Sequence, residues 1–340
     1  MRSVVIEGPG KAVVSTVPDA VLTGPDGCLV QVEATAICGS DLHFYDGDLA
    51  FYPIAVGHEV VGTVVEVGPE VSHRRVGDRV LVASVTGCGR CDGCATGDPI
   101  RCAAGARVFG AGELGGGQAD LLAVPAADFQ TLVVPEGIDV ETALLLTDNL
   151  GTGWAGAQRA GIPPGGTVVV LGLGAVGLCA VRSALALGAG RVLAVDPVAG
   201  RVARAVACGA EAVDGPTVEA VLAATSGRGA DSVIDAVALD TTMDTAFGCV
   251  RAGGTISVIG VHGLEPYPMP LLMGVYRSLT ITMTTAPVHR TWTELVPLLQ
   301  AGGLDASGIF THSFALDDAA AAYAAVAART PDCLKAVLTP

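Results

Sequence analysis

Residues Thr167–Leu171 read Thr-Val-Val-Val-Leu, and Gly172-Leu173-Gly174-Ala175-Val176-Gly177 follows directly. The apolar run predicts a strand that is buried on both faces, and the apolar residues 178–187 predict a helix after the glycines. Gly172 permits a tight turn, Gly174 lets the backbone approach a pyrophosphate, and Gly177 lets helix and strand pack closely. The stretch therefore predicts a strand–loop–helix unit that binds a dinucleotide. A glycine turn without a ligand is the alternative.

The type of dinucleotide is indicated by what surrounds the loop. The glycine loop opens the predicted helix, and free backbone N–H groups there, at Ala175 and Val176, can face phosphates. The next apolar strand, 191–196, ends on Asp196. A carboxylate there can bind both hydroxyls of an adenosine ribose and would repel a 2′-phosphate, so the sequence favours NAD over NADP. NADP stays open because Arg201 is close by in sequence and could meet a phosphate.

The rest of the chain divides by its periodicity. Over residues 151–288 strand and helix patterns alternate, with strands expected at 232–237, 255–259 and 279–283, which predicts a parallel, doubly wound sheet. Residues 1–150 instead show short Val-rich strands such as Cys28–Ala36, separated by Gly, Pro and Asp, and predict a barrel-like β domain. The tail, 289–340, could extend the nucleotide domain or return to the first domain.

Composition excludes several classes of function. The chain has 340 residues, 51% of them hydrophobic, which is enough for large cores. Its formal net charge of −15 makes a surface that repels nucleic-acid backbones and anionic lipid, so we expect neither nucleic acid nor a membrane as a partner. No apolar run reaches the ~18 residues of a membrane span and the first residues lack a signal-peptide pattern, so we expect a cytoplasmic protein.

Four of the ten cysteines lie close together in the sequence: Cys88, Cys91, Cys94 and Cys102. Four thiolates in one short glycine-rich loop, residues 87–103, suit the closed tetrahedral coordination of a structural zinc ion. An iron–sulfur cluster is the alternative metal group. A disulfide pair is the alternative without a metal, and a reducing compartment argues against it.

A second, open metal site is indicated by Cys38 and by His58, which stands in Gly57-His58-Glu59. With one more ligand, this thiolate and imidazole would leave the fourth corner of a zinc ion free for water or substrate. Glu59 and Asp148 are the candidates for the third ligand, and spacing does not choose between them. Taken singly, Cys38 also fits a small core residue and His58 a hydrogen-bonded structural histidine.

Together these motifs resemble the zinc-dependent medium-chain alcohol dehydrogenases over nearly the whole chain. Five landmarks occur in the order of that family: Cys38-Gly-Ser-Asp-Leu-His43, Gly57-His58-Glu59, Gly77-Asp78-Arg79-Val80, the four-cysteine loop, and the glycine loop with Asp196. The resemblance implies an α/β protein in which a GroES-like, β-rich catalytic domain is interrupted by a Rossmann domain. It also implies that residues 289–340 return to the catalytic domain.

The resemblance further implies which residues hold the catalytic zinc. Cys38 and His58 match two of its ligands. Asp148 matches the third, a position that the family fills with Cys, Asp or Glu. Glu59 matches a nearby glutamate that can approach the metal or replace its water.

Ser40 matches the hydroxyl of the family's proton relay, and His43 matches the outer histidine of that relay. In such a relay Ser40 takes the alcohol proton and passes it through the cofactor ribose to His43 and solvent. A turn residue and a surface histidine are the structural alternatives. Val261, which follows the strand 255–259, is expected at the edge of the nicotinamide, and Lys335 is expected at the cofactor phosphates.

The implied function is that of a zinc-dependent oxidoreductase that transfers a hydride reversibly between an alcohol, secondary or aliphatic, and NAD, giving the ketone or aldehyde. Each chain would hold two zinc ions, one catalytic and one structural, and act on a small-molecule substrate. The polyol, threonine and bacterial secondary-alcohol branches, which the motifs resemble most, imply a homo-oligomer, either a tetramer or a dimer. The alternatives are a polyol or amino-alcohol dehydrogenase, an aldehyde dehydrogenase or dismutase, and a non-catalytic NAD- and zinc-binding sensor.

Overall fold

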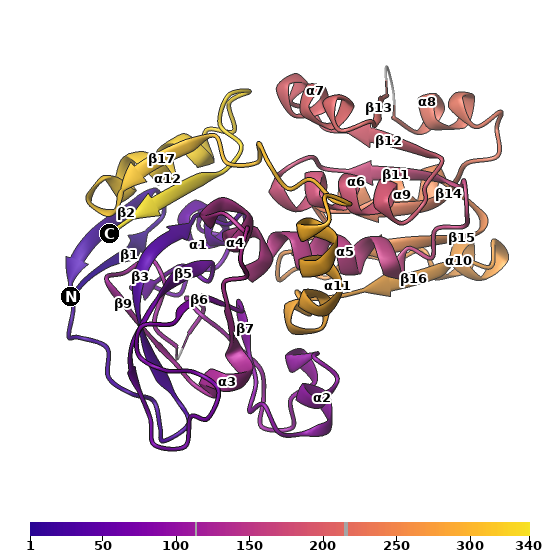
Figure 1. Cartoon of the computed structure of the whole chain (residues 1–340). Coiled ribbons are helices and arrows are strands. Elements are labelled where there is room, and N and C mark those ends of the chain that lie inside the picture. Colours follow the sequence, from indigo (N-terminus) through magenta and orange to yellow (C-terminus); the bar gives the residue numbers. More distant parts are fainter. Residues whose placement is uncertain (113, 214–216) are drawn as a thin grey trace. The chain divides into compact units, whose positions relative to one another are not determined.

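The structure is a computed structural model that describes residues 1–112, 114–213 and 217–340. Its chain divides into two compact units (Figure 1). Unit 1 contains Met1–Gly151, Ala286–Gly302 and Ala306–Pro340. Unit 2 contains Thr152–Thr285 and Gly303–Asp305. The C-terminal segment therefore packs with the N-terminal part of the chain.

Unit 2 is built on one parallel sheet with the strand order β13-β12-β11-β14-β15-β16. The strands are β11 (Thr167–Leu171), β12 (Arg191–Val195), β13 (Glu211–Ala212), β14 (Ala230–Asp235), β15 (Val250–Val258) and β16 (Thr280–Met283). The helices between them are α6 (Ala175–Ala186), α7 (Ala199–Ala207), α8 (Thr217–Ala224), α9 (Asp240–Cys249) and α10 (Leu271–Tyr276). This order confirms the predicted doubly wound sheet. Successive strands are added on one side of β11 up to β13 and then on its other side from β14 onward, so the strand order reverses between β11 and β14.

The sequence of β11 explains its central place. Val169 pairs with Leu193 of β12 on one side and with Val233 of β14 on the other. All five residues of β11 are buried, because helices cover both faces of a parallel sheet and leave no polar face for water. The loop after β11 is therefore held at the carboxyl edge of the sheet, where ligands of such folds bind.

Unit 1 is mainly antiparallel. Its largest sheet has the strand order β10-β6-β5-β3-β18-β17, and β9 also pairs with β3. The strands are β1 (Arg2–Gly8), β2 (Lys11–Thr16), β3 (Cys28–Ala36), β4 (Ile54–Ala55), β5 (Val60–Val67), β6 (Arg79–Val82), β7 (Val85–Thr86), β8 (Arg107–Val108), β9 (Leu121–Val124), β10 (Thr131–Val133), β17 (His312–Ala315) and β18 (Ala336–Thr339). The helices are α1 (Asp41–Asp46), α2 (Asp92–Ala95), α3 (Ala127–Gln130), α4 (Val140–Thr147), α11 (Val288–Gln300) and α12 (Ala319–Ala327), and α5 (Asn149–Arg159) begins here and continues into unit 2.

The last strand of the chain lies inside this sheet. β18 pairs in parallel with β17 and antiparallel with β3, where Val337 faces Ala36. In Figure 1 the yellow C-terminal strands and α12 accordingly lie beside the indigo N-terminal strands. This pairing brings Lys335, just before β18, next to Ile37, just after β3, and so to the site described below.

Candidate active site

Two neighbouring strands bring Cys38 and His58 together. β3 and β5 are antiparallel, and Thr35 pairs with Val60. The chain leaves β3 just before Cys38 and enters β5 just after His58, so both residues lie at the same end of this strand pair. The backbone N–H of Ala36 donates to the carbonyl of Glu59 over 3.3 Å and continues the pairing up to the site.

Asp148 comes from a third element. It occupies the break between α4 and α5, with φ −157° and ψ −71°, which are not helical values. The backbone N–H of Ser84, just past β6, donates to the carbonyl of Thr147 over 3.0 Å and ties the break to the sheet. Because the helix is interrupted here, the carboxylate points toward Cys38 and His58 instead of following the helix surface.

The potential ligand atoms of Cys38, His58, Glu59 and Asp148 all lie within 4.8 Å of one another. The Nε2 atom of His58 lies 3.6 Å from Oδ2 of Asp148, and Sγ of Cys38 is also 3.6 Å from that oxygen. All four residues are buried. A thiol, an imidazole and carboxylates at such distances are the donors that zinc takes in catalytic sites, so the residues fit this ion. Glu59 and Asp148 were the two candidates for the third ligand, and both lie in the cluster.

The electrostatics of the cluster also favour a cation. Burial alone would lower the pKa of His58, but the negative charge of Asp41, together with that of Cys38 when it is a thiolate, outweighs burial and raises this pKa well above its usual value. Burial alone would raise the pKa of Asp148, but the hydrogen bond and charge of His58 lower it. The Cys38 thiol has a raised pKa, chiefly because it is buried. An imidazole that holds its proton this firmly is surrounded by excess negative charge, which a divalent cation would neutralise.

Asp41 contacts two of the candidate ligands, Cys38 and His58. Its Oδ1 lies 3.4 Å from Nδ1 of His58, and its Oδ2 accepts a hydrogen bond of 2.9 Å from the backbone N–H of Cys38. With Nδ1 engaged, Nε2 of His58 is left to face the cluster. A carboxylate behind a ligating histidine fixes the ring orientation and raises its basicity as a ligand.

Asn149 is in contact with three of the four residues of the cluster. Its Nδ2 lies 2.9 Å from Oε1 of Glu59, 3.1 Å from Oδ2 of Asp148 and 3.9 Å from Sγ of Cys38. Ser84 donates to the second oxygen of Asp148 over 3.2 Å. These hydrogen bonds hold both carboxylates in fixed orientations.

Glu59 is held by a buried cation. Nζ of Lys335 lies 2.7 Å from Oε1 of Glu59 and 3.3 Å from the carbonyl oxygen of Ile37. The expectation that Lys335 contacts the cofactor phosphates is therefore wrong, because insertion of β18 buries this side chain next to the metal cluster. Oε2 of Glu59 is buried and has no hydrogen-bond partner among the residues that the structure describes. This oxygen is the one that a metal ion could engage.

Ser40 and His43 lie at the start of α1. Ser40 is the residue before the helix, and its Oγ lies 3.5 Å from Nε2 of His58. The hydroxyl is therefore beside the cluster. His43 is partly exposed, and its Nδ1 lies 3.0 Å from Oδ2 of Asp48, which fixes the orientation of the ring. The two residues are joined directly through the backbone N–H of His43 and the carbonyl of Ser40.

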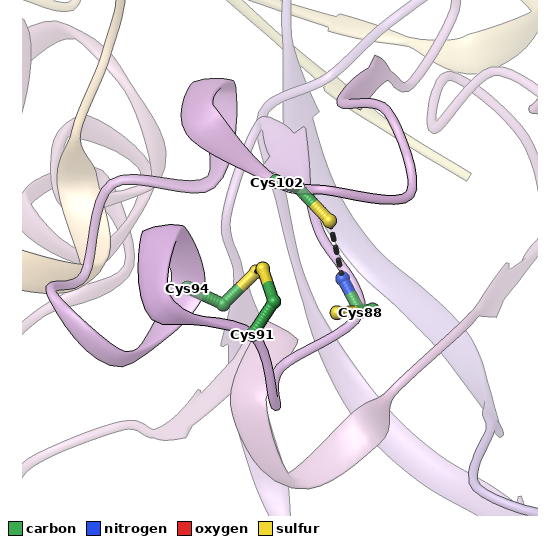
Figure 2. Close-up of side chains that lie close together, drawn as sticks. All are labelled: Cys88, Cys91, Cys94 and Cys102. Atoms are coloured by element: carbon green, nitrogen blue, oxygen red, sulfur yellow. Dashed lines mark hydrogen bonds between the residues drawn. The ribbon is translucent and has the colours of Figure 1, made fainter.

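The four cysteines of residues 87–103 form the second cluster, with their sulfur atoms within 4.8 Å of one another (Figure 2). All are free thiols, so no disulfide joins them. The backbone N–H of Cys88 donates to Sγ of Cys102 over 3.3 Å, as the dashed line in Figure 2 shows. Hydrogen bonds from the N–H groups of Cys94 and Ala103 lower the pKa of Cys91 to about 6. Backbone donors aimed at sulfur favour the thiolate form, which is the form that binds zinc.

The glycine loop in unit 2 follows β11 and opens α6. Gly172 has φ +81°, and a Cβ there would lie 2.2 Å from a methyl carbon of Val237. A Cβ on Gly177 would lie 1.8 Å from the carbonyl oxygen of Gly172. A Cβ on Gly174, in contrast, would meet no atom of the described chain within 4 Å. The protein's own packing explains Gly172 and Gly177, whereas the open space at Gly174 fits the approach of a pyrophosphate.

The residues expected to surround a dinucleotide lie at the same edge of the sheet. Ala175 and Val176 form the first turn of α6, whose N–H groups point out of the helix end. Asp196 follows β12, and its carboxylate accepts hydrogen bonds from the N–H groups of Leu173, over 2.7 Å, and Val198, over 2.8 Å. Nη1 of Arg201 is 3.8 Å from Asp196. Val261, past the end of β15, is 51% exposed.

Several residues around the metal cluster were not identified from the sequence. They are Asp41, Ser84, Asn149 and Gln118, whose Nε2 donates to Oδ2 of Asp41 over 3.1 Å, together with the position of Lys335. Two of them carried a signal, since Asp41 lies inside the motif of Cys38 and Asn149 adjoins Asp148. Ser84, Gln118 and Lys335 carried none, because their proximity arises only from strand pairing.

Comparison with known proteins follows the same division of the chain. The family described as "Alcohol dehydrogenase GroES-like domain" matches residues 24–136, and the family described as "Zinc-binding dehydrogenase" matches residues 175–301. A "probable zinc-binding alcohol dehydrogenase" of Mycobacterium tuberculosis is 59% identical over 100% of this chain and 89% of its own length. None of the helices in the described ranges is long and apolar enough to cross a membrane.

Two solved structures are also similar to this chain over its whole length. The alcohol dehydrogenase TADH from Thermus sp. ATN1 is 33% identical, covers 100% of this chain and 99% of its own, and superposes with a TM-score of 0.92. A zinc-binding dehydrogenase from Sinorhizobium meliloti 1021, solved with NADP, is 29% identical, covers 100% and 99% of the two chains, and has a TM-score of 0.84.

Proposed function

Because the chain belongs to the zinc-dependent medium-chain alcohol dehydrogenase family, we propose that it oxidises a secondary or aliphatic alcohol to the ketone or aldehyde with NAD, reversibly. The observation that carries this proposal is the buried cluster of Cys38, His58 and Asp148, with Glu59 and Ser40 beside it. A structural or sensory zinc protein would need only the four-cysteine site. A second donor set with one uncommitted oxygen fits a metal that takes part in chemistry.

In the proposed reaction, bound zinc supplies a Lewis acid that lowers the pKa of the alcohol hydroxyl, and bound NAD supplies the hydride acceptor. Cys38, His58 and Asp148 would hold the metal. Ser40, whose Oγ lies beside His58, would accept the alcohol proton as it gives up its own hydroxyl proton, and His43, oriented by Asp48, would pass that proton on to solvent. The free oxygen of Glu59 would remain available to the metal ion. Asp41 and Asn149 hold these groups in place.

We propose NAD rather than NADP as the cofactor. Gly172, Gly174, Gly177 and the first turn of α6 would hold the pyrophosphate, and Asp196 would bind the adenosine ribose. The carboxylate would repel a 2′-phosphate, although a relative is solved with NADP and Arg201 adjoins Asp196. We place Val261 at the nicotinamide.

The metal content of paired variants tests the proposal. The purified chain should hold about two zinc ions, one in each cluster. Asp148→Asn should lower the content of the first cluster and abolish the reduction of NAD by secondary alcohols. Cys91→Ser should lower the content of the second cluster and leave a measurable alcohol-dependent rate. A wild-type chain with a single zinc, or an Asp148→Asn variant of normal rate, would remove the catalytic role of the first cluster.

We also propose that the chain forms a homo-oligomer. Unit 2 exposes an uncharged apolar surface on α10, where Leu272 is 82% exposed, Val275 79% and Tyr276 89%. The next strand, β16, is an edge strand of the sheet, and it can pair with β16 of a second chain across a two-fold axis. Two chains of charge −15 repel each other, so contact through a patch without charge is the favourable one.

The mass in solution tests this assignment. Leu272→Glu combined with Val275→Glu should shift the light-scattering mass toward the monomer. Val21→Glu is the matched control, because Val21 is 74% exposed in unit 1. An unchanged mass in the double variant would place the interface elsewhere.

We expect the protein in the cytoplasm, where its zinc-binding thiols stay reduced.

A further inference from the structure

A chain of buried hydrogen bonds runs from α12 to the metal ligands. The hydroxyl of Tyr323 donates to Oε1 of Gln118 over 2.9 Å. Nε2 of Gln118 donates to Oδ2 of Asp41 over 3.1 Å and to the carbonyl of Ala36 over 3.2 Å. Asp41 in turn contacts Cys38 and His58. The side chains of Tyr323 and Gln118 are fully buried, so this connection is isolated from solvent.

The amide of Gln118 can adopt only one orientation in this network. Its oxygen faces a hydroxyl donor, and its nitrogen faces a carboxylate and a carbonyl, so a flipped amide would set acceptor against acceptor twice. Burial raises the pKa of Tyr323 well above its usual value, which keeps the hydroxyl protonated as a donor. The network is therefore fully directional from Tyr323 to Asp41.

The backbone of Gln118 is fixed to the ligand segment as well. The N–H of Gln118 donates to the carbonyl of Val56 over 3.1 Å, and the N–H of Gly117 donates to the carbonyl of Gly57 over 2.7 Å. Gly57 has φ +103°, and a Cβ there would lie 2.5 Å from Cγ of Gln118. The residue before His58 must therefore be glycine for Gln118 to reach Asp41.

We propose that Gln118 and Tyr323 are positioning residues for the catalytic metal, through which the C-terminal helix α12 sets how tightly Cys38 and His58 hold it. Gln118 fixes the carboxylate of Asp41, and one carboxylate restrains two ligands at once. Tyr323 fixes the amide of Gln118. The inference rests on the proposed function, because it assumes that the cluster of Cys38, His58 and Asp148 binds the metal.

The rate of zinc release to a chromogenic chelator tests the role of both residues. The wild-type chain should release zinc in two phases, and the phase missing in Asp148→Asn belongs to the catalytic cluster. Losing a partner that directly contacts a metal ligand usually costs about 10–100-fold, and Gln118 acts on the ligands only through Asp41. Gln118→Leu should therefore accelerate this phase by about 10-fold, the lower end of that range, and Tyr323→Phe, which is one hydrogen bond further from the ligands, by a smaller factor. The phase of the four-cysteine cluster should not change in either variant.

Tyr45→Phe is the matched control. The ring of Tyr45 packs against that of Tyr323, with centroids 5.4 Å apart, but its hydroxyl is not part of the bonds to Gln118. Its release kinetics should equal those of the wild type. Cobalt(II) in the catalytic cluster gives a second readout, since a displaced thiolate or imidazole changes the ligand-field spectrum in Gln118→Leu and Tyr323→Phe but not in Tyr45→Phe.

Two results would overturn the inference while leaving the proposed function intact. One is a catalytic phase and a cobalt spectrum that are unchanged in both variants. The other is an equal acceleration of both zinc phases together with a lower unfolding temperature, which would make Gln118 and Tyr323 part of the general core. A wild-type chain with one zinc phase, that of the four cysteines, would overturn the proposed function and this inference together.

Discussion

Nζ of Lys335 lies 2.7 Å from Oε1 of Glu59, and the two side chains are only 2% and 0% exposed. Burial alone would lower the pKa of Lys335, but the negative charge of Glu59 outweighs it and raises this pKa. A positive charge of the protein itself therefore stays next to the candidate metal ligands. It holds one oxygen of Glu59 and leaves the other without a partner in the described chain.

Removing the cation from this pair should be costly. Lys335→Met leaves the Glu59 carboxylate buried without its partner, and we expect the free energy of unfolding to fall by about 3–5 kcal/mol. Urea denaturation of the zinc-loaded protein measures this change. Adding Glu59→Gln should restore a large part of it, because the double variant no longer buries a lone charge. A loss below about 1 kcal/mol in the single variant would show that the ion pair is dispensable.

Ser40 should be needed for turnover and not for metal binding. Its Oγ is 3.5 Å from Nε2 of His58, but a serine hydroxyl is not among the donors that zinc takes in catalytic sites. Ser40→Ala should lower kcat by about 10²–10⁴-fold, as expected for loss of a group that transfers a proton, while zinc per chain stays the same. Ser40→Thr keeps the hydroxyl and should recover most of the rate. Near-normal turnover of Ser40→Ala would exclude Ser40 from the relay.

Asp196 should decide the choice between NAD and NADP. Its carboxylate lies 3.8 Å from Arg201, which could meet a 2′-phosphate if the acid were absent. Asp196→Ser should raise the ratio of kcat/KM for NADP to that for NAD by about 10-fold or more, equal to about 1.4 kcal/mol. Adding Arg201→Gln should reverse part of this gain. If the ratio stays constant, another residue controls the cofactor choice.

His289 gives the protein a stability that depends on pH. The ring is stacked on Phe129 with centroids 4.2 Å apart, and burial lowers its pKa to about 3. In the unfolded chain the pKa is about 6.5, so between these values the unfolded chain binds the additional proton. The free energy of unfolding should therefore fall as the pH falls below about 6.5, by about 1.4 kcal/mol per pH unit from this group.

Denaturation between pH 6.5 and pH 5 measures that contribution. His289→Phe keeps a stacked ring without the titrating nitrogen, and its stability should fall less steeply with acidification than that of the wild type. His73→Gln is the control, since His73 is exposed, and it should follow the wild-type curve. Parallel curves for the wild type and His289→Phe would mean that His289 is protonated in the folded protein.

Features that are local in the chain could be predicted from the sequence. The strand, loop and helix around Gly172 follow from an apolar run and three glycines, because steric limits act over a few residues. The four-cysteine cluster is local for the same reason, since a short loop limits how far its thiols can separate. The resemblance to the family also pointed correctly to the α/β fold.

Features that depend on contacts between distant segments needed the structure. Asp148 and Glu59 were equal candidates from spacing alone, and the break between α4 and α5 brings Asp148 to the cluster beside Glu59. Lys335 was expected at the cofactor phosphates, yet strand β18 pairs with β3 and buries it against Glu59. No sequence pattern marked Gln118, which reaches Asp41 only because its segment pairs with the one before His58.

The sequence by itself determined which chemical groups this protein has: a glycine loop that fits a pyrophosphate, four clustered thiols, and a thiol, an imidazole and carboxylates that fit a second metal site. Only the tertiary structure decided which of these groups meet and what surrounds them, such as the cation at Glu59 and the amide behind Asp41. The physical reason is that each residue carries its own side-chain chemistry and short-range steric preferences. Proximity between distant segments depends instead on strand pairing and on burial of the whole sheet.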